Sequence, residues 1–420
     1  MRRLSVLCRL VACVATAGLL AGCGGGSSQD SKTPETPAQT PQEAKSQNAP
    51  ASQTVNSPPP GATASAAVDL EAQYDKGSAL AAAGQFQEAR SVFEAAARQD
   101  PQDGSLAAGV AIFRDRDEGR VSDGAVQRIF RALERGNKGQ WTEAHADVDE
   151  AIKLSPEYPR AHAARGTLFL IQGKYQDAVK AFDRAVVLDP RLAEGYFNRG
   201  VTYTELRQYD AAVKDLTRAI DLQPDFADTY RNRATAYLNR GLARQNKPDM
   251  FAARDDYTKA HELDPRATEP LYERGLMYTL AEEWDSAAAD FTQVIERDPA
   301  HALSYYNRGL AYQNQGDDDR ALADYTKAIE LNAADAAPFI NRGKIYVGRK
   351  QHDLAIADYD KAIAAAPNLA MAHFNKAVAF DQAGRAQEAA AAYRTFLEKA
   401  GTDNASLASQ ARQRLAALER

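Results

Sequence analysis

The sequence predicts an all-α fold made of a row of similar helical hairpins. An Asn-Arg-Gly segment followed by tyrosine occurs at residues 198–203, 307–312 and 341–346, and the last two copies lie 34 residues apart. Within each 34-residue repeat, apolar residues follow two short helical spacings separated by a turn. Because a single hairpin of this kind cannot bury its own apolar face, neighbouring hairpins must stack on one another.

The first 22 residues predict an export signal. Two arginines open the chain, and residues 10–20 form an apolar run that is too short to span a bilayer stably. Leu20-Ala21-Gly22-Cys23 follows this run directly and resembles the lipobox of bacterial lipoproteins. The resemblance implies cleavage after Gly22 and acyl chains on Cys23, which would anchor the chain to a membrane. An ordinary secretory signal cleaved elsewhere is the alternative.

The same resemblance predicts where the protein is located. Gly24, not aspartate, follows Cys23, which favours the outer membrane over the inner membrane. We therefore expect a lipid-anchored protein of the bacterial cell envelope that faces the periplasm. The other two cysteines, Cys8 and Cys13, lie inside the signal segment, so the folded part has no thiol for disulfides, metal binding or catalysis.

Residues 23–69 predict a disordered tether. Residues 24–68 contain seven prolines, no aromatic residue and only two large aliphatic residues, Val55 and Val68. Such a composition cannot bury enough apolar surface to offset the entropy lost on ordering. The tether would let the folded part lie away from the membrane.

The repeats follow in order along the rest of the chain. The first repeat covers 70–103, and a connector that we expect to be irregular covers 104–124, with a helix at 106–113 and a solvated charged loop after it. Repeats two to nine cover 125–403, and residues 404–420 predict a final amphipathic helix. The nine repeats begin at Leu70, Ala125, Pro159, Ala193, Ala227, Thr268, Ala302, Ala336 and Ala370.

The repeat at 227–267 is seven residues longer than the others. The additional residues lie within 239–248, between its two expected helices. One interpretation is a lengthened hairpin turn. The other is a basic protrusion that touches a partner, because insertions in repeat proteins gather on one face.

Residue size alternates in register with the repeat. The eighth position is always glycine or alanine, the twentieth is always alanine, and large residues such as Phe182, Phe291 and Tyr359 follow four residues later. This pattern predicts closely packed helices with small residues opposite large ones. Prolines such as Pro190 and Pro224 predict the ends of second helices, because proline lacks the amide proton.

These features together resemble the tetratricopeptide repeat, and the resemblance extends over residues 70–403. It implies a right-handed α-solenoid of nine hairpins whose first helices line a concave groove. Residues 404–420 would cap the exposed apolar end of the array. The resemblance also implies that protein partners bind in the groove.

Two rows of residues would lie along that groove. Side-chain amides offer a donor and an acceptor, so a row of asparagines at the sixth position could pair with the backbone of a bound peptide. The alternative is that these asparagines brace neighbouring helices. Apolar or aromatic residues at the fifth position would lie beside them and favour binding. The candidate peptide-binding residues are Asn198, Asn232, Asn307, Asn341, Asn375, Phe197, Tyr272, Tyr306, Ile340 and Phe374.

Arginine at the seventh position is matched by an aspartate in the second helix of the same repeat. The spacing is sixteen residues, or twenty-three across the insertion. We predict structural ion pairs between the two helices, which would fix the register of each hairpin. The pairs are Arg131 with Asp147, Arg199 with Asp215, Arg233 with Asp256, Arg274 with Asp290, Arg308 with Asp324, and Arg342 with Asp358.

The composition argues against several classes of function. The net charge is −6, and it becomes −9 without the three arginines of the signal, so nucleic acid is not an expected partner. No converging catalytic group, phosphate-binding loop or metal-ligand motif occurs in the sequence, so we expect no enzyme activity, cofactor, metal or small-molecule substrate.

We therefore expect a membrane-anchored scaffold that binds proteins. Resemblance to tetratricopeptide lipoproteins suggests secretion, pilus assembly, polysaccharide export or recruitment of cell-wall enzymes. The alternatives are a subunit of an envelope enzyme complex and a self-assembling structural protein.

Overall fold

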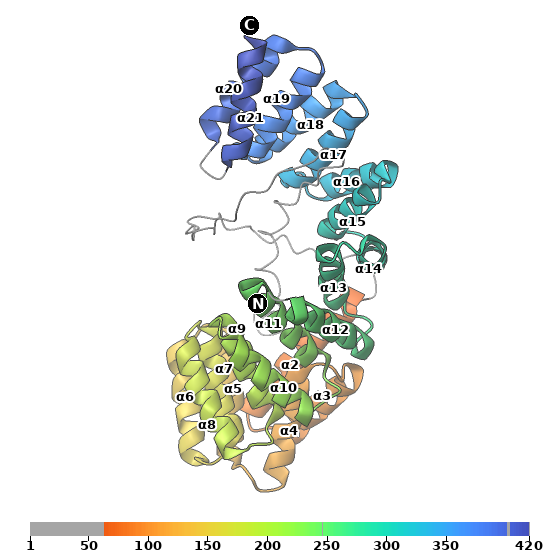
Figure 1. The fold of residues 1–420 in the computed structure, drawn as a ribbon. Helices are drawn as coiled ribbons and strands as arrows, with labels where there is room; N and C mark the ends of the chain where they lie inside the picture. Colours follow the sequence, from red (N-terminus) through yellow and green to blue (C-terminus); the bar gives the residue numbers. More distant parts are fainter. Residues whose placement is uncertain (1–62, 246, 401–403, 420) are drawn as a thin grey trace. The chain divides into compact units, whose positions relative to one another are not determined.

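The computed structural model describes residues 63–245, 247–400 and 404–419, and all its elements in these ranges are α-helices (Figure 1). The predicted all-α repeat fold is confirmed. The predicted signal segment, Cys23 and most of the predicted tether lie outside the described residues. The chain divides into a first lobe, up to residue 174, and a second lobe from residue 175 onward that also takes residues 101–104.

The first helix of the first lobe begins earlier than the sequence suggested. It starts at residue 63, seven residues before the predicted repeat, so the tether prediction was wrong for residues 63–69. This segment contains three alanines, the best helix former, which lowers the cost of extending the helix. The helices are α2 (Thr63–Ala82), α3 (Phe86–Gln99), α4 (Gly104–Asp117), α5 (Asp123–Asn137), α6 (Trp141–Leu154) and α7 (Pro159–Ile171).

Three phenylalanines form the centre of the first lobe. Phe93 of α3, Phe113 of α4 and Phe130 of α5 are almost fully buried, and their ring centroids lie 5.4 to 5.8 Å apart. The rings of Phe113 and Phe130 are stacked. Each buried ring removes a large apolar area from water, so these residues hold the three helices together.

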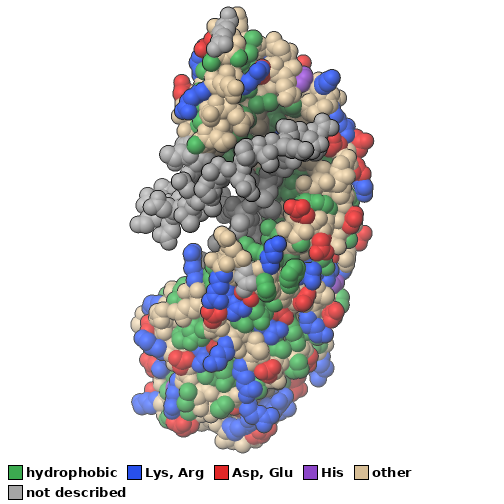
Figure 2. Space-filling view, in the orientation of Figure 1, with side chains coloured by type: hydrophobic (Ala, Val, Ile, Leu, Met, Phe, Trp, Pro, Cys, Tyr) green, Lys and Arg blue, Asp and Glu red, His purple; other side chains and the backbone are tan. Residues whose placement is uncertain are grey.

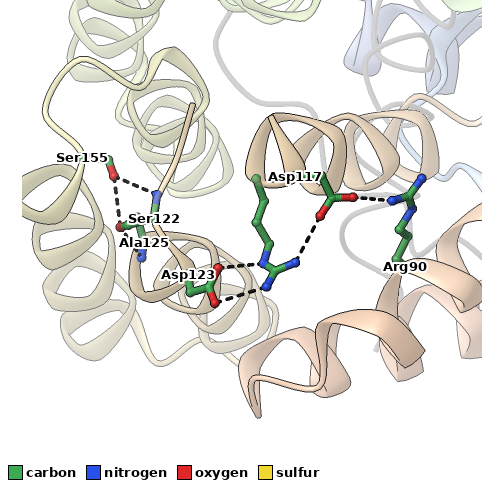
Figure 3. A network of polar contacts seen from close by, with 7 residues as sticks. Arg90, Asp117, Ser122, Asp123, Ala125 and Ser155 are labelled. Carbon is green, nitrogen blue, oxygen red and sulfur yellow. Dashed lines mark hydrogen bonds and ion pairs between the residues drawn. The ribbon is translucent and has the colours of Figure 1, made fainter. Parts of the chain in front are cut away.

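The expected irregular connector at 104–124 is mostly helix. The charged residues 114–117 form the last turn of α4, although a solvated loop was expected there. The charges of Asp115, Arg116 and Asp117 are matched by partners within the lobe, which allows this charged turn to pack as a helix. Arg116 Nε donates to Asp123 Oδ1 at 2.7 Å, and Arg90 pairs with Asp117 (Figure 3). Asp115 is buried and accepts from the Tyr158 hydroxyl at 2.9 Å.

The second lobe contains fourteen described helices that alternate along the chain. Its second helices end two residues before Pro190, Pro224, Pro265, Pro299 and Pro367. The helices are α8 (Tyr175–Leu188), α9 (Ala193–Glu205), α10 (Tyr209–Leu222), α11 (Ala227–Arg244), α12 (Lys247–Leu263), α13 (Glu269–Leu280), α14 (Trp284–Arg297), α15 (Ala302–Asn314), α16 (Asp318–Leu331), α17 (Ala336–Gly348), α18 (His352–Ala365), α19 (Ala370–Gln382), α20 (Ala386–Lys399) and α21 (Ala405–Leu418).

Consecutive helices of the second lobe pack against each other from α8 to α21. First helices also touch across repeats, as α13 touches α15 and α17 touches α19. At the end of the lobe, α21 packs on α20, with Ala408 and Ala411 buried against a core that includes Phe396. The last helix therefore covers an apolar surface that a further repeat would otherwise cover.

Glycine at the eighth position lets the two helices of a hairpin meet closely. A Cβ atom on Gly309 would lie 2.9 Å from Tyr325, and one on Gly343 would lie 2.7 Å from Tyr359. These tyrosines are almost completely buried. Alanines at the twentieth position, such as Ala321 and Ala355, are fully buried beside them. The small residues thus make room for the large ones.

The seven additional residues of the longer repeat extend helices. The interpretation of this segment as a lengthened hairpin turn is therefore wrong. Helix α11 has 18 residues and α12 has 17, whereas the neighbouring hairpin α9–α10 has 13 and 14. Pro248 lies in the first turn of α12, where a proline is tolerated because its missing amide proton is not needed.

Candidate functional site

The first helices of the second lobe carry the predicted binding residues. We call the side of α9, α11, α13, α15, α17 and α19 that carries the second, fifth, sixth, ninth and thirteenth positions the first-helix face, because these positions lie three or four residues apart along a helix. Asn232, Phe197 and Ile340 are buried, and Asn307 is only 2% exposed. The remaining predicted residues are half-buried, namely Asn198, Asn341, Asn375, Tyr272, Tyr306 and Phe374.

The two predicted rows are joined by hydrogen bonds between repeats. Asn307 Nδ2 donates to the hydroxyl of Tyr272 at 3.1 Å, and Asn341 Nδ2 donates to the hydroxyl of Tyr306 at 3.2 Å. In both cases the sixth residue of one repeat reaches the fifth residue of the preceding repeat. Burial raises the pKa of Tyr306 to about 12, so its hydroxyl stays protonated. These asparagines are at least partly engaged in bracing the helices.

This bracing depends on a hydroxyl in the preceding repeat. Before Asn232 the fifth residue is Phe197, and Asn232 Nδ2 donates to the backbone oxygen of Asp228 on its own helix at 2.7 Å. Before Asn375 the fifth residue is Ile340, which has no polar group, and Asn375 Nδ2 has no hydrogen-bond partner among the described residues. The asparagines of the row therefore differ in their hydrogen-bond partners.

The repeat that follows the longer one begins at Thr268. Its sixth position is glutamate instead of asparagine. Glu273 of α13 is only 5% exposed. Burial raises its pKa to about 7, Arg231 on α11 opposes this, and Glu269 adds to it. The sequence analysis missed Glu273, although it occupies the position where the flanking repeats have Asn232 and Asn307.

All six arginine–aspartate pairs are present between the helices of their hairpins. In the Arg342–Asp358 pair, Nε and Nη2 of the arginine donate to the two carboxylate oxygens at 2.8 and 2.7 Å. The aspartates are buried, and such bidentate pairs are strong because both partners are charged and the geometry is fixed. Comparable contacts join Arg131 to Asp147, Arg199 to Asp215, Arg233 to Asp256, Arg274 to Asp290, and Arg308 to Asp324.

Two arginines of the longer repeat, Arg240 and Arg244, are also paired. Arg240 donates to both oxygens of Asp249 at 2.7 and 2.8 Å and to Asp210 of the preceding hairpin at 2.8 Å. Arg244 donates to Asp210 at 2.5 Å. These arginines therefore join α11 to its neighbours and do not form a free basic surface.

The described residues contain no group of three or more histidine, cysteine or acidic side chains that could hold a metal ion. Among them, no helix is both long and apolar enough to cross a membrane. Asp317 of the acidic segment 317–319 accepts from the Arg320 backbone nitrogen at 3.0 Å, so it caps α16. Figure 2 shows acidic and basic side chains interspersed over the face in view, without a large field of one sign.

Comparison with known protein families finds three models, each described as tetratricopeptide repeat. They match residues 167–236, residues 61–104, 131–193 and 340–405, and residues 302–334. A comparison with curated protein sequences finds no significant match.

Many solved structures have a similar fold. The crystal structure of MamA is 24% identical, with a TM-score of 0.38, over 41% of this chain and 91% of that one. YrrB, described as a tetratricopeptide protein with an unusual peptide-binding site, is 22% identical, with a TM-score of 0.40, over 46% and 95% of the two chains. The C-terminal part of a repeat protein from Cytophaga hutchinsonii is 18% identical, with a TM-score of 0.49, over 57% and 95%.

Proposed function

Because this chain is a tetratricopeptide-repeat protein, with family matches over more than half of its length, we propose that it is a non-catalytic scaffold that binds proteins on its first-helix face. The observation that carries this proposal is a pair of exposed leucines on neighbouring first helices. Leu280 of α13 is 44% exposed and Leu303 of α15 is 47% exposed. On α15, exposed Leu303 and half-buried Tyr306 and Leu310 follow one another at spacings of three and four residues, and such an apolar strip favours a protein–protein contact.

A second part of the proposal concerns the location of the scaffold. The lipobox-like segment that ends at Cys23 supports attachment to a bacterial envelope membrane by acyl chains, with the repeats in the periplasm and the outer membrane favoured. There the scaffold would assemble an envelope complex for secretion, pilus formation, polysaccharide export or cell-wall synthesis.

The location is tested by separating membrane and soluble fractions of cells that produce the wild-type chain or C23S. We expect the wild-type chain in the outer-membrane fraction, with a mature N-terminal peptide whose mass shows acylated Cys23. The C23S chain should lack the acyl mass and leave that fraction. A wild-type chain that is soluble and cleaved elsewhere would contradict the anchor.

The scaffold function is tested by capturing partners with three forms of the full chain. L303E places a charge on the first-helix face, whereas L354E places the same charge on α18, a second helix, where Leu354 is 50% exposed. We expect wild-type and L354E to retain the same discrete partners and L303E to lose them. Equal capture by all three forms would contradict binding on this face.

A further inference from the structure

The charge of the first-helix face changes between α13 and α15. The second and sixth positions of α13 are Glu269 and Glu273, whereas the same positions of α15 are Leu303 and Asn307. The two helices touch, so an acidic part of the face borders the apolar strip of α15 to which we assign partner binding. A partner that covers Leu303 therefore lies next to the carboxylates of α13.

Glu273 is a deeply buried carboxylate that lacks a hydrogen-bonding partner. Only 5% of the residue is exposed, and no hydrogen bond or ion pair joins its side chain to another described residue. Its oxygens are not among the side-chain atoms that are both sealed from solvent and unbonded, so they still open onto the first-helix face. A carboxylate in this position has lost most of its hydration without gaining a counter-ion, which favours a cation from outside.

The charged groups on α11 and α13 do not neutralise Glu273. Arg231 of α11 favours the ionised form of Glu273, but its Nε and Nη2 atoms both donate to Asp228 Oδ1, at 3.1 and 2.7 Å. Glu269 lies one turn before Glu273 on the same side of α13 and opposes its ionisation. Three carboxylates thus share one guanidinium group.

The titratable groups that face this place from α12 and α15 carry no positive charge near pH 7. Burial raises the pKa of Tyr257 on α12, which keeps its hydroxyl neutral. Burial lowers the pKa of His301 at the start of α15, so its ring is also neutral, although nearby Glu269 acts in the opposite direction. The described residues therefore offer Glu269 and Glu273 no cation other than the shared Arg231.

We propose that Glu269 and Glu273 together bind a lysine or arginine side chain of a partner segment whose neighbouring residues are apolar and cover Leu303. This inference rests on the proposed scaffold function and names the chemistry of its partner. The cation would replace the hydration that Glu273 has lost and would reduce the repulsion between two carboxylates one turn apart. Packed helices lie about 8 to 10 Å apart, so in an extended segment the basic residue should lie about three residues from the apolar one.

A basic side chain fits this place better than a metal ion. Calcium takes about six to eight oxygen ligands, and the described residues contain no group of three or more acidic, histidine or cysteine side chains that could hold a metal. A lysine or arginine also has an aliphatic stem that packs on apolar surface. Exposed Leu280 and half-buried Tyr272, on the same face of α13, offer such a surface.

The proposal can be tested with immobilised libraries of short apolar peptides, blocked at both ends, that carry one central lysine. In a second library the lysine is acetylated, which removes the charge and keeps the stem. A third library has the acetylated lysine and a free N-terminal amine. Binding of the full chain is compared with that of E269Q, E273Q and E262Q from pH 6.5 to 8.5. Glu262 of α12 is the matched control, because it is exposed and pairs with Lys259 at 3.2 Å.

At pH 8.5 we expect the wild-type chain and E262Q to bind the best lysine peptides about three- to tenfold more tightly than their acetylated counterparts. E269Q and E273Q should each lose most of this preference while they keep their affinity for the acetylated peptides.

The pH dependence separates a direct role of Glu273 from a structural one. In the wild-type chain the preference for lysine should grow between pH 6.5 and 8.5, because Glu273, whose pKa is about 7, becomes charged over this range. In E273Q any remaining preference should stay constant, since the peptide lysine stays charged throughout.

Several outcomes would overturn the proposal. These are equal binding of both blocked libraries by the wild-type chain, a preference that survives in E269Q or in E273Q, a wild-type preference that does not change with pH, a preference only for the free N-terminal amine, and an absence of any peptide binding. If both blocked libraries bind equally and L303E abolishes both, the scaffold function stands and only the role of the two glutamates is wrong. If no peptide binds and L303E captures the same partners as the wild-type chain, both proposals fail.

Discussion

Arg308 joins the second helices of two consecutive repeats through Asp324 and Thr292. Its Nε and Nη2 atoms each donate to the Asp324 carboxylate of α16 at 2.8 Å, while Nη1 donates to Thr292 Oγ1 of α14 at 3.0 Å. The two partners lie sixteen residues after and sixteen residues before the arginine. Arg342 makes the same contacts with Asp358 and Thr326.

In two repeats whose second helix lacks the aspartate, the cation at the seventh position pairs with an aspartate sixteen residues earlier. Arg165 has Ala181 sixteen residues later and pairs with Asp149, sixteen residues earlier. Lys376 has Ala392 sixteen residues later and pairs with Asp360, again sixteen residues earlier. In repeats two to nine, the cation at the seventh position thus has a carboxylate on at least one side, so the same side chain contributes to hairpin register and to repeat stacking.

Removal of one member of this contact should destabilise the second lobe. R308M leaves Asp324 buried without its counter-ion, and breaking such a pair costs about 3 to 5 kcal/mol. We expect a clearly lower urea midpoint, and the double variant R308M/D324L should regain part of the loss because no unpaired charge remains. An unchanged midpoint in R308M would contradict a structural role for the pair.

The small residue at the eighth position of each repeat gives a second prediction, about the stability of the hairpin. In G309A the new Cβ would lie 2.9 Å from Tyr325 and 3.3 Å from Asp324 Cβ, so the tightly packed helices must move apart. We expect a loss of about 1 to 3 kcal/mol of unfolding free energy. Gly348, at the end of α17, has nothing within 4 Å of such a Cβ, so G348A is the matched control and should be neutral or slightly stabilising. Equal effects of the two substitutions would contradict the packing explanation.

Because Glu273 is buried, the stability of the folded chain should depend on pH, and the direction of this dependence can be derived. The pKa of Glu273 rises from an ordinary 4.5 to about 7 in the folded chain. Because the folded chain holds this proton more tightly, the associated stabilisation is complete below pH 4.5 and is lost as the pH rises through about 7. E273Q should therefore become more stable than the wild-type chain as the pH increases over this range, by at most on the order of 3 kcal/mol.

Urea midpoints of the wild-type chain and E273Q, measured at several pH values, check this prediction. Histidines titrate in the same range, so the difference between the two chains is the informative quantity. E262Q, at an exposed glutamate of α12, is the control and should follow the wild-type chain. A constant difference between E273Q and wild type from pH 4.5 to 7 would show that Glu273 is not buried as described.

Two arginines of the longer repeat should differ in their importance. Arg240 neutralises buried Asp249, whereas Arg244 contacts only exposed Asp210. R240M should lower the unfolding free energy by on the order of 2 kcal/mol, because it removes the arginine that pairs with both oxygens of the buried Asp249 carboxylate. R244M should leave the urea midpoint almost unchanged. The opposite order would mean that α11 and α12 are not joined through Asp249.

The repeat itself could be predicted from the sequence, because the residues that recur lie close together within each repeat. Helices α9, α15, α17 and α19 begin at the predicted residues Ala193, Ala302, Ala336 and Ala370. The length of α11 and α12 could not be predicted in the same way. Gly241 and Pro248 are residues that favour turns, but here they lie in the last and first turns of two helices, where both are tolerated.

The details of the first-helix face depend on contacts between repeats. An asparagine at the sixth position has the same sequence context in several repeats, yet Asn341 meets a tyrosine hydroxyl and Asn375 meets none, because their preceding repeats have Tyr306 and Ile340. Such information lies in pairs of residues that are far apart along the chain.

The most direct test of the scaffold function is photo-crosslinking in living cells. A photoreactive residue is placed at Leu303 on α15 or at Leu354 on α18, two leucines of similar exposure on a first and a second helix. Leu303 is preferred to Tyr306 and Asn341, because those two side chains bond to each other. The proposed function predicts a discrete crosslinked protein from position 303 and none from position 354. The same products from both positions, or none from position 303, would contradict it.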